Sequence, residues 1–345
     1  MDIQQLRATA RAMVTTGKGI LAADESTGTI KRRFDAINAE CTEQNRRDYR
    51  EMLFRTDGAN EFISGVILYD ETIRQKAADG TLMVKVLQDQ GIIPGIKVDM
   101  STNPLVNAPG EVITDGLDGL RDRLSEYHGL GARFAKWRAV ITIGDGIPSQ
   151  YCIDANAHLL ARYAALCQEA NLVPIVEPEV LMDGTHTIDR CYEVTEATLR
   201  QVYRELAQQR VDLTGIILKP NMVLSGKDAS NRASAEEVAE KTVACFLNTV
   251  PAAVPGIAFL SGGQSDDEAT TNLDAINRRA SDVGAPWELS FSFGRGLQAA
   301  PLKAWGGVSA NFDKARHAYY HRAKVTSAAR MGSYSVDMER EVAAD

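Results

Sequence analysis

Eight short apolar runs recur along this 345-residue chain, spaced about 30 to 45 residues apart, and each leads through a polar or Gly/Pro-rich exit into a helix-like stretch. Alternation of strand-like and helix-like segments predicts an α/β protein with a parallel sheet. Eight such units predict a (β/α)8 TIM barrel in a single domain. The runs cover residues 19–23, 65–69, 93–98, 133–138, 173–177, 215–219, 256–261 and 288–293.

The stretches between the runs support this fold. Residues 155–170, 195–209 and 234–248 carry apolar side chains at helical spacing, and the last opens with Ser234 and Glu237, close to a capping box. An open, doubly wound sheet is the alternative α/β fold, and it predicts a Gly-x-Gly-x-x-Gly turn after the first strand. Residues 23–28 read Ala-Asp-Glu-Ser-Thr-Gly instead, which favours the barrel.

Composition limits the setting in which the chain works. No linker divides it, so we expect a barrel domain over residues 1–327 and, because residues 328–345 lack an apolar period, a mobile C-terminal tail. A net charge of −8 argues against nucleic acid as the main partner. The first residues lack the apolar core of a signal peptide, and no apolar stretch approaches the ~20 residues that span a membrane. Five scattered cysteines suggest reduced thiols and a cytoplasmic location.

Lys219 ends one of the apolar runs and is followed by Pro220. A lysine at the exit of a buried parallel strand is placed where burial and neighbouring positive charge lower its pKa. A neutral amine attacks carbonyl groups and forms a Schiff base. The alternative is a lysine whose stem packs while its ammonium group reaches water. Because the other apolar runs also end in polar or charged residues, we favour the interpretation of Lys219 as a nucleophile.

Two of these exits carry paired charges. Lys136 and Arg138 are two positions apart, which places both on one face of a strand, and so are Glu177 and Glu179. Pro178 is expected to end the hydrogen-bonded ladder of its strand. Two carboxylates that face two cations titrate together, and such a network keeps a lysine neutral. Structural salt bridges at the barrel mouth are the alternative for either pair.

Two further segments are suited to binding phosphate. The loops with Ser261, Gly262 and Gly263 and with Gly294 and Arg295 follow the seventh and eighth runs, where barrels of this kind bind phosphate. Glycine lets backbone N–H groups approach an anion, and a helix N-terminus attracts it.

A second anion site is expected where Ser26 and Thr29 begin a helix, with charge from residues 31–33 and from Lys97. An ordinary helix cap with a solvated basic face is the alternative. Two anion sites on either side of an amine predict a small ligand with a phosphate at each end and a carbonyl group inside.

Metal chemistry finds little support in the sequence. None of the five histidines follows an apolar run, and no Cys-x-x-Cys pair is present. We therefore expect neither a metal nor a cofactor.

Seven segments, in order, resemble class I fructose-bisphosphate aldolase: residues 19–28, 95–99, 134–138, 176–179, 218–222, 260–265 and 294–295. The resemblance runs from about residue 3 to about residue 325. It implies a glycolytic and gluconeogenic enzyme that reversibly cleaves fructose 1,6-bisphosphate into dihydroxyacetone phosphate and glyceraldehyde 3-phosphate. It also implies a homotetramer that uses a lysine Schiff base and no cofactor.

The resemblance carries roles onto particular residues. Lys219 is similar to the Schiff-base lysine, and Lys136 to the lysine that keeps the neighbouring amine neutral. Glu177 resembles the acid/base residue for dehydration and C3–C4 cleavage, Asp24 the carboxylate that orients the C4 hydroxyl, and Glu179 its supporting partner.

The phosphate-binding residues follow in the same way. Ser261, Gly262, Gly294 and Arg295 resemble the C1-phosphate site, with Gly263 in the same loop and Arg33 nearby. Ser26, Thr29 and Lys97 resemble the C6-phosphate site, with Thr29 in a position where serine is expected, and Arg138 belongs to the same charged wall.

One departure from the family concerns the tail. Members from animals end in a tyrosine that aids proton exchange at the dihydroxyacetone phosphate carbon, whereas this chain ends in aspartate and carries Tyr334 earlier in the tail. Either Tyr334 or another acid takes that role. Two other functions stay open on the sequence: an enzyme that holds pyridoxal phosphate on Lys219, and a non-catalytic sugar-phosphate sensor.

Overall fold

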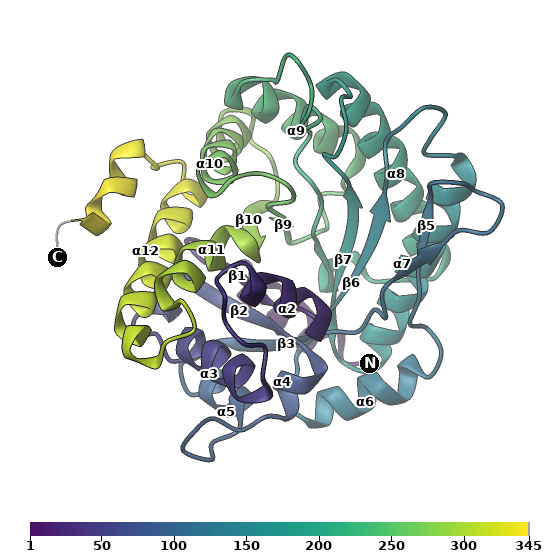
Figure 1. Cartoon of the computed structure of the whole chain (residues 1–345). Helices are drawn as coiled ribbons and strands as arrows, with labels where there is room; N and C mark the ends of the chain where they lie inside the picture. The colour runs from purple at the N-terminus through teal and green to yellow at the C-terminus, as the bar shows by residue number, and fades with distance from the viewer. Residues whose placement is uncertain (344–345) are drawn as a thin grey trace.

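Eight parallel strands close into a barrel at the centre of the molecule, and helices surround it (Figure 1). The computed structural model describes residues 1–343. Around the barrel the strands follow the order β1-β10-β9-β8-β7-β6-β3-β2, so the predicted (β/α)8 barrel is confirmed. The barrel strands are β1 (Gly19–Ala23), β2 (Ile63–Leu68), β3 (Ile93–Lys97), β6 (Phe134–Ile141), β7 (Val173–Val180), β8 (Ile217–Leu218), β9 (Gly256–Phe259) and β10 (Glu288–Phe293).

A short antiparallel hairpin, β4 (Thr102–Pro104) with β5 (Val112–Thr114), extends from the loop after β3. The three helices expected from apolar spacing are present, and α7 and α8 begin several residues earlier than expected, after the caps Ser149 and Thr187. The α-helices of the described chain are α1 (Ile3–Met13), α2 (Thr27–Asp35), α3 (Glu43–Phe54), α4 (Asp70–Arg74), α5 (Met83–Gln88), α6 (Leu120–Gly129), α7 (Gln150–Glu169), α8 (Ile188–Gln208), α9 (Ala235–Thr249), α10 (Asp266–Val283), α11 (Arg295–Trp305) and α12 (Phe312–Arg330).

The apolar core has two layers. The larger cluster lies between the outward-facing side chains of the strands and the surrounding helices. The smaller cluster fills the lower half of the barrel and includes Leu6 and Met13 of α1, which contact inward-facing strand residues. Phe134 occupies the floor, and a Cβ atom on Gly95 would lie 2.2 Å from its ring. Glycine on β3 therefore gives the large aromatic side chain the space that it needs.

Side chains on a strand alternate between inward and outward, and this alternation places the functional residues in a layer above the floor. Ile175 and Ile217 belong to the inner apolar cluster. The next inward-facing position on each strand path is charged, Glu177 after Ile175 and Lys219 after Ile217. Trp137 points outward into the larger cluster, as the spacing on β6 predicts. The interior of the barrel thus changes from apolar to charged at its C-terminal end.

The prediction that Pro178 ends its strand is wrong, because β7 continues to Val180 and stays paired with β6. Lys219 donates its backbone N–H to the carbonyl oxygen of Val176, so even-numbered residues of β7 direct their backbone groups toward β8. The barrel strand β8 ends at Leu218. The lack of an N–H group on Pro178 therefore removes no hydrogen bond from the ladder between β7 and β8. The side chain of Asn221 instead accepts from the N–H of Val180 at 3.0 Å.

The chain leaves the barrel through α12, which crosses the expected domain boundary and ends at Arg330. A 3-10 helix, η4 (Val336–Ala343), follows and lies beside α12 (Figure 1). Glu339 forms an ion pair with Arg322, and the ring of His321 lies 2.8 Å from the carbonyl oxygen of Met338. The mobility of this tail stays a prediction. None of the helices in residues 1–343 combines the length and apolar character that a bilayer crossing requires.

Candidate active site

A cavity of about 670 Å³ opens at the C-terminal end of the barrel. The residues that the sequence predicts for the site line this cavity, with two exceptions. Gly263 is exposed next to the cavity, and Lys31 is an exposed residue of α2 that pairs with Asp35. A Cβ atom on Gly263 would lie 2.9 Å from the side chain of Met182, so this glycine permits close packing of its loop. The polar strand exits therefore meet in one place, as barrel geometry requires.

Lys219 is the most deeply buried amine of the cavity, with 3% of its surface exposed. Its Nζ lies 3.4 Å from Oε1 of Glu177. Burial lowers the pKa of Lys219, and the nearby charge of Lys136 lowers it further, although Glu177 acts in the opposite direction. The side chain therefore offers a neutral amine at lower pH than an ordinary lysine does.

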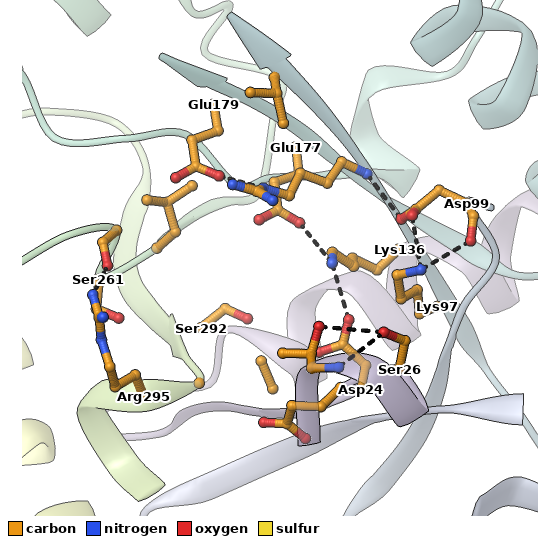
Figure 2. Close-up of a pocket in the computed structure, with 18 of the residues that line it drawn as sticks. Asp24, Ser26, Lys97, Asp99, Lys136, Glu177, Glu179, Ser261, Ser292 and Arg295 are labelled. Atoms are coloured by element: carbon orange, nitrogen blue, oxygen red, sulfur yellow. Dashed lines mark hydrogen bonds and ion pairs between the residues drawn. The ribbon is translucent and has the colours of Figure 1, made fainter. Parts of the chain in front are cut away.

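Lys136 connects two carboxylates. Its Nζ donates to Oδ2 of Asp24 at 2.9 Å and lies 3.3 Å from Oε2 of Glu177 (Figure 2). Burial opposes the charged form of Lys136, but Asp24 and Glu177 outweigh it and raise its pKa. Burial likewise opposes ionisation of Asp24, while the cations Lys136 and Lys219 lower its pKa to about 2. The centre thus holds a cation and an anion next to a lysine whose pKa is lowered.

Arg138 and Glu179 form a second ion pair above this centre. Glu179 is buried, whereas the Arg138 side chain keeps 40% of its surface exposed. Burial works against the charge of Arg138, but Glu179 and then Glu177 outweigh it and raise the pKa of Arg138. The predicted pairing of two carboxylates with two cations is present, on adjacent strands β6 and β7.

The two predicted phosphate sites lie on opposite sides of the cavity, with Ser261 and Arg295 on one side and Ser26 and Lys97 on the other (Figure 2). Gly262 has a φ of +53°, a conformation that favours glycine and turns the loop at Ser261. Arg295 begins α11 and donates to the carbonyl oxygen of Gly262 at 2.6 Å. This loop and the N-terminus of α11 therefore form one continuous edge of the cavity.

On the other side, Ser26 caps α2, and its hydroxyl lies 3.2 Å from that of Thr29. Arg32 donates to the Thr29 hydroxyl at 3.2 Å. The ammonium group of Lys97 lies next to Asp99. It donates to the backbone carbonyl oxygen of Asp99 at 2.9 Å, and it lies 2.8 Å from the side-chain Oδ1 of the same residue. Hydroxyl groups, a helix N-terminus and cations thus converge at this side, as an anion site needs.

Sequence reasoning missed three buried polar residues of the cavity wall. Glu25 and Asp99 are buried carboxylates that bind cations of the site, Arg33 and Lys97 respectively. Ser292 lies on β10 with 1% exposure, and its hydroxyl has no hydrogen-bond partner among the described residues. The only signal for Ser292 was its inward position in a predicted strand. A buried hydroxyl without a partner at a cavity wall is suited to contact a ligand.

The arrangement defines a (β/α)8-barrel enzyme with a buried amine between two edges that carry hydroxyl groups and cations. Among residues 1–343, no group of three or more His, Cys, Asp or Glu side chains is arranged to bind a metal ion. A neutral amine beside a carboxyl group is able to condense with a ketone, and flanking anion sites would hold the ends of a phosphorylated substrate.

Comparison with known proteins gives the family. The family model described as glycolytic, fructose-bisphosphate aldolase class-I, matches residues 5–345. The probable fructose-bisphosphate aldolase class 1 of Xanthomonas campestris pv. campestris is 57% identical, over 97% of this chain and 99% of that protein. The cytosolic fructose-bisphosphate aldolase 4 of Arabidopsis thaliana is 53% identical, over 97% of this chain and 85% of that protein.

A solved structure agrees with these relatives. The fructose-bisphosphate aldolase of Plasmodium falciparum, in complex with TRAP and a small-molecule inhibitor, superposes with a TM-score of 0.94 at 48% identity, covering 96% of this chain and 95% of that one. The chain therefore belongs to the class I fructose-bisphosphate aldolase family. The family and the kind of enzyme that the sequence predicts, a carbon–carbon lyase, are confirmed.

Proposed function

We propose that this chain cleaves fructose 1,6-bisphosphate reversibly into dihydroxyacetone phosphate and glyceraldehyde 3-phosphate, with Lys219 as the nucleophile. The observation that carries the assignment is a fully buried lysine with a lowered pKa, 3.4 Å from the carboxyl group of Glu177. An amine of this kind condenses with the C2 ketone to give an iminium ion. The iminium nitrogen then accepts the electron pair that C3–C4 cleavage releases.

Glu177 serves as the acid and base of this sequence. It protonates the leaving hydroxyl group of the carbinolamine and later removes the proton from the C4 hydroxyl. Its two oxygens face Lys219 and Lys136 at 3.4 and 3.3 Å, so one carboxyl group reaches both the forming imine and the charged centre. A pKa of about 2 keeps Asp24 ionised, which suits a hydrogen-bond acceptor that orients the C4 hydroxyl.

Lys136 remains an ammonium ion because its pKa is raised. It therefore acts through charge, keeping Lys219 neutral and assisting iminium formation. Glu179 supports the centre by holding Arg138 in the cavity wall. Binding of both phosphate groups fixes the breaking bond against Glu177, and orientation of this kind can supply several kcal/mol, roughly 7 to 11 at best.

The phosphate groups bind at the two edges of the cavity. The C1 phosphate lies at the loops of Ser261 with Gly262 and Gly294 with Arg295, near Arg33. The C6 phosphate lies at Ser26, Thr29 and Lys97. Hydroxyl groups, backbone N–H groups and cations at these edges supply the donors that phosphate oxygens need.

The cellular setting follows from the family and its relatives. We assign a cytoplasmic location, supported by the names of the cytosolic plant relatives and by five free cysteines. We also assign a homotetramer on family resemblance, with a barrel domain of residues 1–327 and a tail from residue 328 onward. The enzyme works without a cofactor, and because the mechanism needs no metal, activity should persist in EDTA.

Borohydride reduction tests the assignment of Lys219. Dihydroxyacetone phosphate and borohydride are added together, and the labelled peptide is mapped. We expect irreversible inactivation and one label, on Lys219, with no label in the Lys219→Met variant. A label elsewhere, or none while turnover continues, would contradict the proposal.

A further inference from the structure

Glu25 is a buried carboxylate at the cavity wall that the proposed mechanism does not use. It follows β1 directly after Asp24, and its side chain is 4% exposed. Oε1 accepts from Nη1 of Arg33 at 2.5 Å and from Nε2 of Gln298 at 2.8 Å. Its backbone carbonyl accepts from Arg50 at 2.8 Å. A charged group held from so many sides has one fixed position.

Gln298 connects this carboxylate to the helix that carries the proposed phosphate loop. It lies on α11, one turn after Arg295, and its Nε2 also donates to the carbonyl oxygen of Ala22 at 2.7 Å. Its Oε1 accepts from the hydroxyl of Tyr49 at 3.1 Å. Both ends of the amide are therefore used, which fixes its orientation and with it the place of Glu25 relative to α11.

Arg33 extends from α2 between Glu25 and this phosphate loop. Nη1 contacts Glu25, while Nη2 lies 3.7 Å from where a Cβ atom on Gly294 would be. One end of the guanidinium group is thus anchored on a buried carboxylate, and the other end borders the N-terminus of α11. A planar guanidinium is able to bind an anion on one edge while it keeps a hydrogen bond on another.

We propose that Glu25 is a positioning residue that holds Arg33 beside Gly294, where the guanidinium binds the C1 phosphate monoester of the substrate. This inference rests on the proposed function. Arg33 would otherwise be a flexible side chain that must be ordered when substrate binds, and that ordering weakens affinity. Oε2 of Glu25 is buried and has no hydrogen-bond partner among the described residues, so it can accept a second guanidinium N–H when Arg33 turns toward phosphate.

The first test is Glu25→Gln, which keeps the shape and the contact with Gln298 but removes the charge. We expect KM for fructose 1,6-bisphosphate to rise about tenfold with kcat changed by less than about twofold, because a charge-assisted anchor is lost while the reacting groups stay in place. The concentration of dihydroxyacetone phosphate that gives half-maximal borohydride labelling of Lys219 should rise by the same factor.

A matched control separates this effect from a general loss of stability. Asp274 is a buried carboxylate on α10 that pairs with Arg278 and does not line the cavity. Asp274→Asn removes an equivalent charge and should leave KM unchanged. A double-mutant cycle adds Arg33→Ala, and in that background Glu25→Gln should have no further effect on KM.

The results separate the inference from the assignment on which it rests. Normal labelling of Lys219 with an unchanged or lowered KM in Glu25→Gln would overturn the role of Glu25 and leave the function standing. So would a tenfold KM increase that persists in the Arg33→Ala background. Absence of labelling in the unaltered enzyme would overturn the proposed function itself.

Discussion

Oε1 of Glu177 lies 3.4 Å from Nζ of Lys219, with both side chains buried and carried by the adjacent strand paths of β7 and β8. A carboxyl group at this distance from an amine is placed to transfer protons at the carbon that the amine attacks. The second oxygen of Glu177 faces Lys136, so one residue connects the nucleophile to the charged centre.

Glu177→Gln tests this relationship directly. The amide keeps the size of the side chain but does not exchange protons, so we expect kcat for fructose 1,6-bisphosphate cleavage to fall at least ~100-fold. KM should change little, because the residues proposed to bind the phosphate groups are untouched. Steady-state kinetics provide both values, and cleavage at the original rate would remove Glu177 from the mechanism.

The pH dependence of Schiff-base formation depends on Lys136. Only the neutral amine of Lys219 attacks a carbonyl group, so formation slows as pH falls through the pKa of Lys219. Burial and then the Lys136 ammonium group lower this pKa against the opposing effect of Glu177. Lys136→Met removes the cation, so the pKa of Lys219 should rise and the acid limb should move to higher pH.

The rate of borohydride labelling as a function of pH measures this limb without requiring cleavage. An acid limb that stays in place, or moves to lower pH, would show that Lys136 does not control the ionisation of Lys219. Arg138→Met is a useful comparison, because Arg138 pairs with Glu179 and is not among the groups that most affect the pKa of Lys219.

The sequence was sufficient to predict the residues whose place follows from strand periodicity. Lys136 and Arg138 on β6, and Glu177 and Glu179 on β7, face the cavity because inward positions recur every second residue. Lys219 follows the same period on the path of β8. Charged side chains at inward positions near the C-terminal end of a strand lie at the barrel mouth, because the interior below it is apolar.

Residues just beyond the strand ends were harder to place. Glu25 follows Asp24 directly, so alternation would send it away from the cavity, but β1 ends at Ala23 and alternation no longer applies. Asp99 likewise lies two residues past the end of β3. Their roles depend on which cations the helices bring near, Arg33 from α2 and Lys97 from the strand itself, and this is set by tertiary packing.

Asp99 should control affinity for the C6 phosphate through Lys97. It holds the Lys97 ammonium group at 2.8 Å, and its other oxygen accepts from the backbone N–H of Arg138 at 3.3 Å. Asp99→Asn weakens the anchor, so KM for fructose 1,6-bisphosphate should rise about three- to tenfold, the range expected when one hydrogen bond to a charged group is weakened. KM for fructose 1-phosphate, which lacks the C6 phosphate, should stay unchanged. An equal rise for both substrates would contradict a specific action through Lys97.

Phe134 should be a principal determinant of barrel stability. Its side chain is fully buried in the inner cluster, against Gly95 of the neighbouring strand. Phe134→Ala leaves a cavity at the floor and should lower the free energy of unfolding by about 3 to 5 kcal/mol. Urea unfolding followed by tryptophan fluorescence measures the change. Gly95→Ala should also destabilise the fold, because its new methyl group would overlap the Phe134 ring.

Tyr334 provides a test of how the last proton is handled. Its backbone N–H donates to Asp274 at 2.9 Å, its hydroxyl donates to Glu339 at 3.3 Å, and its ring packs against the outer core. Tyr334 is not among the described residues that line the cavity. Burial raises the pKa of its hydroxyl, and Glu339 raises it further, which makes the group a weaker acid.

We therefore expect Tyr334→Phe to leave proton exchange at the dihydroxyacetone phosphate carbon within about twofold of the original rate, because a group outside the site contributes no general acid catalysis. Loss of deuterium from labelled dihydroxyacetone phosphate, followed by NMR, measures this step apart from cleavage. A decrease of about tenfold or more would be in the range of general acid catalysis and would mean that the tail leaves α12 and brings Tyr334 to the barrel mouth during turnover.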